Sequence, residues 1–429
     1  MKTINQGPGR PVPPAESRRR AAFAVYALAA MCFMAASSAP TPLYRVYQAE
    51  WELTPALMTS VFAVYAVSLL AALLTVGSLS DYLGRKSVVL SSLALEIVSI
   101  VLFLAAADVW MLIAARLVQG LATGAATAAL AAGLADLNPR RAPLINSVAP
   151  IVGLAAGALG SAALVEYGPN PLHLVYLVLL ALLVLLFVAA ALMAPAGTAS
   201  PGVLASLRPT LSVPGPARIP LLAVAPALVA VWALGGFFLS LGPTLAADVT
   251  GSRSALIGGW TAFALTMSGA VAVLVLRTTA AAAVLRIGSV ALVAGVAVAL
   301  VGTNTGSAWL FFAGTAVAGI GFGAGFQGAM RSVMPLAESH QRAGLLAAFY
   351  VVSYLAMGVP SVAAGVAVPF AGIRTTATAY GALVIALGLT ALIGTWTVRP
   401  RNRESQVPPV TLQTCGAPLD IGHPISGKL

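Results

Sequence analysis

Long apolar runs alternate with short polar breaks along almost the whole chain of 429 residues. Most runs contain the roughly 20 apolar residues that an α-helix needs to cross the hydrocarbon core of a bilayer. Inside a bilayer each backbone polar group needs an internal partner, and a helix satisfies these groups within its own segment. The pattern predicts an all-α membrane protein with twelve spans, near residues 22–43, 56–78, 87–106, 109–133, 147–165, 172–194, 220–244, 255–276, 286–303, 308–330, 344–368 and 376–398.

The breaks also predict how the chain is organised. The first apolar run is longer than the core of a signal peptide, so we interpret it as a retained first helix. A central polar stretch rich in Pro and Gly is too short to fold alone and is interpreted as a tether. The expected parts are an N-terminal cytoplasmic segment (1–20), a six-helix bundle (21–194), a cytoplasmic linker (195–218), a second six-helix bundle (219–398) and a disordered cytoplasmic tail (399–429).

An internal repeat supports two related halves. Sliding the chain by 201 residues, without gaps, aligns prolines, arginines and glycines at equivalent corners of the two bundles. Parallel halves related by an axis along the membrane normal are one known membrane architecture, with a site between them at mid-membrane. The aligned positions are Pro42 with Pro243, Arg85 with Arg286, Gly120 with Gly321, Gly124 with Gly325, Arg141 with Arg342 and Gly157 with Gly358.

Composition and charge exclude a soluble protein. The chain is 59% hydrophobic and 8% charged, with a mean hydropathy of +0.95, whereas soluble domains carry about 25% charged residues. The net charge of +11 does not indicate nucleic-acid binding, because the basic residues form short clusters between spans. Of the 23 basic residues, all but Arg45, Arg253, Arg374 and the intramembrane Arg116 fall on one side, so both termini are expected in the cytoplasm.

No cofactor or metal is expected. The two cysteines and three histidines are too scattered for a metal site or a disulfide. A Gly-rich run at 319–328 lies inside a span without the Gly-Lys-Ser/Thr of a phosphate loop, which argues against ATP as the energy source. Arginine outnumbers lysine 20 to 3, as in GC-rich coding, which favours a prokaryotic inner membrane.

The loop after the second span carries the most specific motif, Gly77-Ser-Leu-Ser-Asp81-Tyr-Leu-Gly84-Arg85-Lys86. Gly84 permits a tight reversal, Asp81 suits a helix N-terminus, and Arg85 and Lys86 suit an anionic membrane surface. The run resembles the signature loop of the major facilitator superfamily. The resemblance implies a transporter in which this loop acts as a conformational latch.

Small residues mark two further motifs. Arg116-Leu-Val-Gln119-Gly120-Leu-Ala-Thr-Gly124 resembles a motif of the superfamily's drug:proton antiporter branch, where the arginine is linked to proton coupling. A related glycine motif in the fifth span is only partly present, with Ala158 and Ser161 in place of the branch's proline and glycine. Close helix packing is expected at Gly120, Gly124, Gly153, Gly157 and Gly160.

Two ionisable residues within spans matter most, Glu96 and Arg116. A charge at mid-bilayer costs roughly 2.5–3.5 kcal/mol on insertion scales, so such residues pair or face water. At about 1.5 Å rise per residue from the intervening turn, their depths agree within about 3 Å, which predicts an ion pair. Two interpretations stay open: the pair holds a helix hairpin together, or Glu96 exchanges a proton during the transport cycle.

Polar and aromatic side chains form the predicted substrate cavity. By the resemblance, the first, fourth, seventh and tenth spans line the pathway and the second, fifth, eighth and eleventh flank it. Aromatic rings with a few hydrogen-bonding groups suit an uncharged or weakly cationic amphipathic solute. The candidates are Ser38, Thr41, Tyr65, Gln119, Thr123, Trp232, Phe237, Phe326, Gln327, Tyr350 and Tyr354. Pro40, Pro42 and Pro243 are expected to kink or end the first and seventh helices.

These features predict a secondary active transporter and not an enzyme. We expect proton-coupled efflux of small amphipathic or drug-like compounds by alternating access. The expected partners are the substrate, protons and the lipid bilayer, with no nucleic acid, and the protein is expected to be a monomer. A sugar or metabolite permease working by uniport or symport is the alternative, followed by a membrane sensor that does not transport. An intramembrane enzyme would need a converging catalytic set that these spans lack.

Overall fold

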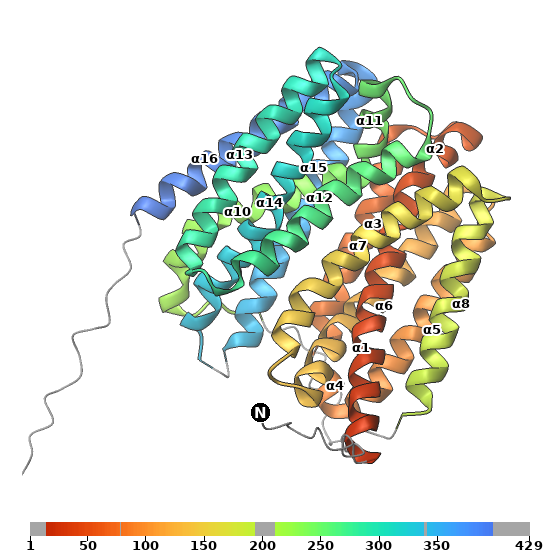
Figure 1. The fold of residues 1–429 in the computed structure, drawn as a ribbon, viewed down its shortest axis with the longest axis vertical. Coiled ribbons are helices and arrows are strands. Elements are labelled where there is room, and N and C mark those ends of the chain that lie inside the picture. The colour runs from red at the N-terminus through yellow and green to blue at the C-terminus, as the bar shows by residue number, and fades with distance from the viewer. Residues whose placement is uncertain (1–13, 78, 194–210, 339–340, 398–429) are drawn as a thin grey trace, which may run out of the picture.

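The computed structural model describes residues 14–77, 79–193, 211–338 and 341–397, and these ranges contain helices and no β-strand (Figure 1). The first half ends with α8. Its helices are α1 (Pro14–Ser38), α2 (Pro40–Trp51), α3 (Pro55–Val76), α4 (Leu79–Leu83), α5 (Arg85–Leu104), α6 (Val109–Leu137), α7 (Ala142–Tyr167) and α8 (Pro171–Ala191).

The second half repeats this arrangement. Its helices are α10 (Gly215–Ser240), α11 (Gly242–Thr250), α12 (Ala255–Val275), α13 (Ala281–Thr305), α14 (Ala308–Val333), α15 (Arg342–Ala371) and α16 (Ile373–Thr397). Short 3₁₀ turns follow α12 and α14, at Leu276–Thr278 and Met334–Leu336. Most of the expected linker and the whole expected tail lie outside the described residues.

Twelve segments of the described chain are helices long and apolar enough to cross a membrane, which confirms the predicted number. The first span differs from the prediction, because it is a longer segment made of α1 and α2, which meet at Ala39. Pro40 stands at the start of α2, and a proline both lacks an N–H and collides with the preceding turn. The seventh span divides in the same way, with Pro243 in the first turn of α11.

The two halves lie side by side in Figure 1 and come together at the end where α2 and α11 lie. They diverge toward the opposite end, where α1 begins. We call these the α2–α11 end and the N-terminal end. Between the halves α3 packs against α15 and α7 against α12. A hydrogen bond at the α2–α11 end joins them, because the Ala255 N–H donates to Glu166 Oε2 over 2.8 Å.

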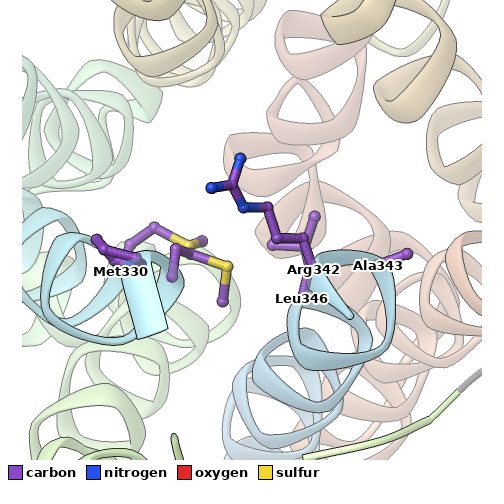
Figure 2. A pocket seen from close by; sticks show the side chains of 6 residues that line it. Met330, Arg342, Ala343 and Leu346 are labelled. Carbon is purple, nitrogen blue, oxygen red and sulfur yellow. The ribbon is translucent and has the colours of Figure 1, made fainter. Parts of the chain in front are cut away.

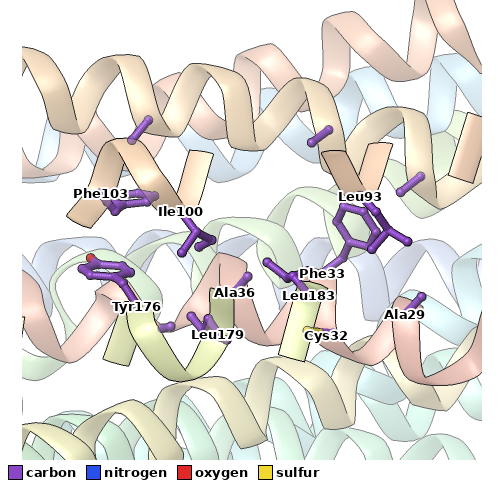
Figure 3. Close-up of a cluster of buried hydrophobic side chains, with 14 of the residues drawn as sticks. Ala29, Cys32, Phe33, Ala36, Leu93, Ile100, Phe103, Tyr176, Leu179 and Leu183 are labelled. Atoms are coloured by element: carbon purple, nitrogen blue, oxygen red, sulfur yellow. The ribbon is translucent and has the colours of Figure 1, made fainter. Parts of the chain in front are cut away.

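The apolar core of the first half lies between α1, α5 and α8. Phe33 of α1, Leu93 and Ile100 of α5 and Leu183 of α8 are almost completely buried against one another (Figure 3). At the N-terminal end Lys86 Nζ donates to the carbonyl of Ala191 over 2.8 Å, as suits a cation at the C-terminus of a helix. This core fixes the helices that carry the polar site.

Glycines set the closest helix contacts. A methyl group at Gly120 or Gly124 would overlap the backbone of α3, and one at Gly153 or Gly157 would overlap the backbone of α1. Small residues thus bring α6 against α3 and α7 against α1 at short range. The packing predicted for Gly160 is wrong, because nothing lies within 4 Å of the place its side chain would occupy.

Candidate functional site

A buried polar network occupies the first half. Glu96, Arg116 and Gln119 are each 0% exposed. Arg116 Nη1 donates to Gln119 Oε1 over 2.5 Å, and Gln119 Nε2 donates to Glu96 Oε1 over 3.0 Å. α5 supplies the carboxyl group and α6 supplies the other two side chains. The three groups therefore form one chain of hydrogen bonds.

The ion pair predicted between Glu96 and Arg116 is therefore not a direct one. Within the described residues no ion pair joins these side chains, and Gln119 lies between them. The guanidinium turns instead toward the break between α1 and α2. There it donates to the carbonyl of Ser37 over 2.9 Å and to the hydroxyl of Tyr44 over 2.5 Å.

Pro40 explains why this break receives side chains from α6. In a continuous helix the carbonyl of Ala36 would accept from the N–H of residue 40, and proline has none. Gln119 Nε2 donates to that carbonyl over 3.2 Å and so supplies the missing partner. Ser37 provides a second carbonyl at the same place. Hydrogen bonds to these two carbonyls therefore connect the polar network with the proline break.

Aromatic rings surround the guanidinium. Its central carbon lies 5.6, 5.4 and 5.6 Å from the ring centroids of Tyr44, Tyr65 and Phe103. Cation–π contacts of this kind partly replace hydration for a charge removed from water. Of the three rings, sequence reasoning selected Tyr65 alone. Tyr44 was missed because it follows the predicted end of the first span, and Phe103 because an apolar residue in a span carries no distinguishing signal.

Glu96 retains one free oxygen. Its Oε2 atom is buried without a hydrogen-bond partner in the described structure. The bond that Oε1 accepts from Gln119 is compatible with both the charged and the protonated carboxyl group, because either form keeps an accepting oxygen. The hydroxyls of Thr41 and Thr123 are also buried without partners. The link to Gln119 is therefore compatible with either protonation state of Glu96.

A group of aromatic residues lies in the second half. The ring centroid of Trp232, on α10, is 5.7 Å from that of Phe326 on α14 and 4.8 Å from that of Tyr354 on α15. Tyr350 lies 6.0 Å from Tyr354. We call these four residues the aromatic cluster. Trp232 and Tyr354 also pack against the core of the first half, so the cluster lies at the boundary between the halves.

The remaining predicted cavity residues are not all part of this cluster. Phe237 is buried elsewhere in the second half, 4.8 Å from the ring of Tyr380. Ser38 donates to the carbonyl of Leu154 and joins α1 to α7. Gln327 donates to the carbonyl of Val273 over 3.2 Å, and its Oε1 has no partner in the described structure.

The signature loop shapes the N-terminal end of the first half. Gly84 has a φ of 85°, which a residue with a side chain rarely adopts, and it precedes α5 directly. Arg85 donates to Ser80 over 2.6 Å and to Asp136 over 3.3 Å, which ties the loop to α6. Asp81 belongs to α4, and its side chain lies outside the described part of the structure. Gly77 follows α3 directly.

In the described part of the chain, twelve helices long enough to span a membrane form two halves, with a polar network inside one half and an aromatic cluster at its boundary with the other, and they define a polytopic membrane protein. The chain belongs to the Major Facilitator Superfamily, which it matches over residues 26–309. It is therefore a membrane transporter for a small molecule and not an enzyme.

A solved structure of a mutant of the nucleoside transporter NupG has the same fold. The TM-score is 0.65 and the identity is 14%, with 87% of this chain and 99% of that one covered. No curated protein matches the chain significantly in sequence.

Proposed function

We propose that the protein is a proton-coupled secondary transporter that exports small amphipathic compounds across a prokaryotic inner membrane. In this proposal it works as a monomer by alternating access, with both termini in the cytoplasm. The observation that carries the proposal is Glu96, a fully buried carboxyl group with one free oxygen and a relay through Gln119 to Arg116. A carboxyl group in such a place is typical of proton pathways in membranes.

The internal repeat supports a proton role for the first half alone. At the offset of 201 residues, the positions equivalent to the three network residues hold Ala297, Val317 and Ile320. The second half therefore has no counterpart of the network at these positions. A symmetric architecture with these charged groups in one half alone separates the proposed ion site from the proposed substrate site.

The aromatic cluster shows the opposite asymmetry and supports a substrate role for the second half. The first-half equivalents of Trp232 and Tyr354 are Met31 and Gly153. In the second half, the Trp232 indole N–H is buried without a partner in the described structure. Edge-on and tilted rings with one free donor suit an amphipathic solute that carries a hydrogen-bond acceptor.

In this proposal a movement of the halves couples the two sites through the contact between α15 and α3. Gly358, one turn after Tyr354 on α15, would place a Cβ 3.8 Å from Ala63 and 3.9 Å from Ala66 of α3. These alanines flank Tyr65, whose ring lies beside Arg116. A rocking of α15 against α3 would therefore displace Tyr65 and the guanidinium beside it. Because Gln119 joins Arg116 to Glu96, the movement would also change the hydrogen bonding of Glu96.

The test uses purified protein in liposomes with an internal pH dye and an imposed proton gradient. Addition of an amphipathic solute should move protons through the wild type. Glu96→Gln should abolish solute-dependent proton flux and keep solute exchange without a gradient. Ser92→Ala is the matched control, because Ser92 lies one turn earlier on α5 and its hydroxyl is also buried without a partner.

The outcomes separate the proposal from its rival. Proton flux that persists in Glu96→Gln would make the carboxyl group a structural partner of Gln119 and end its proton role. Solute movement without proton movement in the wild type would instead favour a permease that works by uniport.

A further inference from the structure

A cavity of about 540 Å³ opens at the N-terminal end of the second half (Figure 2). This volume falls within the roughly 300–1,000 Å³ of small-molecule sites. Its lining comes from the end of α14, the turn after it and the start of α15. The lining residues are Met330, Met334, Pro335, Arg342, Ala343 and Leu346. Five of the six are apolar, and the sixth is a guanidinium.

Arg342 is an exposed residue at the opening of this cavity. Its Nε donates to the carbonyl of Ala337 over 3.3 Å, and this hydrogen bond restricts the position of the guanidinium group. The two terminal nitrogens point into the cavity in Figure 2, and within the described ranges no hydrogen bond or ion pair occupies them. A guanidinium stays charged at any physiological pH and binds a carboxylate through two parallel hydrogen bonds. Among the described residues that line the cavity there is no carboxylate.

Along α14 and α15 the lining residues of the cavity lie near the aromatic cluster. Met330 lies four residues after Phe326 on α14, and Leu346 lies four residues before Tyr350 on α15. Residues four apart lie on the same face of a helix. The apolar wall of the cavity is therefore one helical turn from two members of the cluster. Methionine side chains also adapt to ligands of different shape.

We propose that this cavity is the first binding station for the transported solute, and that the solute is an amphipathic anion. Its carboxylate or sulfonate would bind Arg342, and its apolar part would lie against Met330, Met334 and Leu346. The proposal deepens the proposed function, on which it rests for the transport step. It replaces the expected uncharged or weakly cationic substrate, because an unneutralised guanidinium at the opening repels a cation.

The test is the binding of radiolabelled decanoate to full-length protein in a non-ionic detergent. Decanoate should bind at least about tenfold more tightly than decanol, which has the same chain without the charge. Decyltrimethylammonium should not compete. Arg342→Gln should weaken decanoate binding about tenfold, and Arg342→Lys should weaken it less, because a point charge remains without the fork.

Arg286→Gln is the matched control. Arg286 is exposed on α13, and its Nε also donates to a backbone carbonyl over 3.3 Å, yet it does not line the cavity. A loss of binding in this control equal to that in Arg342→Gln would reduce the effect to general charge and overturn the proposal. Leu346→Gln gives a second test, because it should weaken decanoate more than hexanoate.

Two further outcomes would also overturn the proposal. One is competition by decyltrimethylammonium as strong as that by decanoate. The other is displacement of decanoate by a short-chain phosphatidylglycerol with the same dependence on Arg342, which would assign the cavity to a lipid headgroup. Because binding is measured without a gradient, a failure of proton coupling in Glu96→Gln would leave this result unaffected.

Discussion

Replacing Gln119 with leucine should remove the link between Glu96 and Arg116 at nearly constant volume. The amide accepts one bond from the guanidinium and donates one to the carboxyl group and one to the carbonyl of Ala36. Hydrogen bonds inside membrane proteins contribute about 0.6 kcal/mol on average and up to about 1.7 kcal/mol. Two of these three have an ionisable partner, so the expected loss is roughly 3 kcal/mol of unfolding free energy.

Ser99→Ala is the control for this prediction. Ser99 also joins α5 to α6, through one neutral bond of 2.9 Å to the carbonyl of Ala115. Its removal should cost only about 0.6 kcal/mol. The assay is reversible unfolding in bicelles, with both variants compared with the wild type. If Gln119→Leu costs no more than Ser99→Ala, the three-residue network contributes nothing to stability and the reasoning fails.

A double-mutant cycle identifies the partner responsible. In a Glu96→Gln background the Gln119→Leu change should cost about 1 kcal/mol less, because no ionisable carboxyl group is then left without a donor. An additive result would show that Gln119 acts on Arg116 and Ala36 alone.

Two contacts elsewhere give the remaining predictions. Glu166→Gln should weaken the bond to the Ala255 N–H by about 1 kcal/mol, a roughly fivefold shift away from the conformation closed at the α2–α11 end. Spin-label distances across the N-terminal end measure this, and an unchanged distribution contradicts it. Gly120→Ala should destabilise by roughly 1–3 kcal/mol, because its Cβ would lie 2.5 Å from the Tyr65 carbonyl oxygen. Gly160→Ala, in open space, should be neutral or stabilising, and equal unfolding free energies of the two variants would refute the packing argument.

The helices and their number could be predicted because one physical constraint, the thickness of the bilayer, dominates the sequence pattern. The proline breaks were also predictable from the missing N–H of Pro40. The relation between Glu96 and Arg116 was predicted only in part. Spacing from a turn gives the depth of a residue, whereas the side on which it meets its neighbours depends on the rotation of each helix. That rotation places Gln119 between the two charges.

Gly160 shows a second limit of the sequence pattern. Its spacing from Gly153 and Gly157 predicts a common face, but the partner helix α1 ends at Ser38, beside Gly157. No further turn of α1 is left for Gly160 to meet. The cavity around Arg342 was missed for a related reason, because a basic residue at the end of a span is ordinarily interpreted as an anchor at the membrane surface.

The missing N–H of Pro40 connects α2, the second part of the first span, with the buried polar network. Gln119 replaces the absent donor to the carbonyl of Ala36, and the same amide group donates to Glu96. A change in the direction in which the chain leaves α1 would therefore also change the hydrogen bonding of Glu96. A residue with an N–H at position 40 would compete with Gln119 for that carbonyl. The bend of the first span at Pro40 and the protonation of Glu96 are then coupled to each other, because both depend on the hydrogen bonds of Gln119.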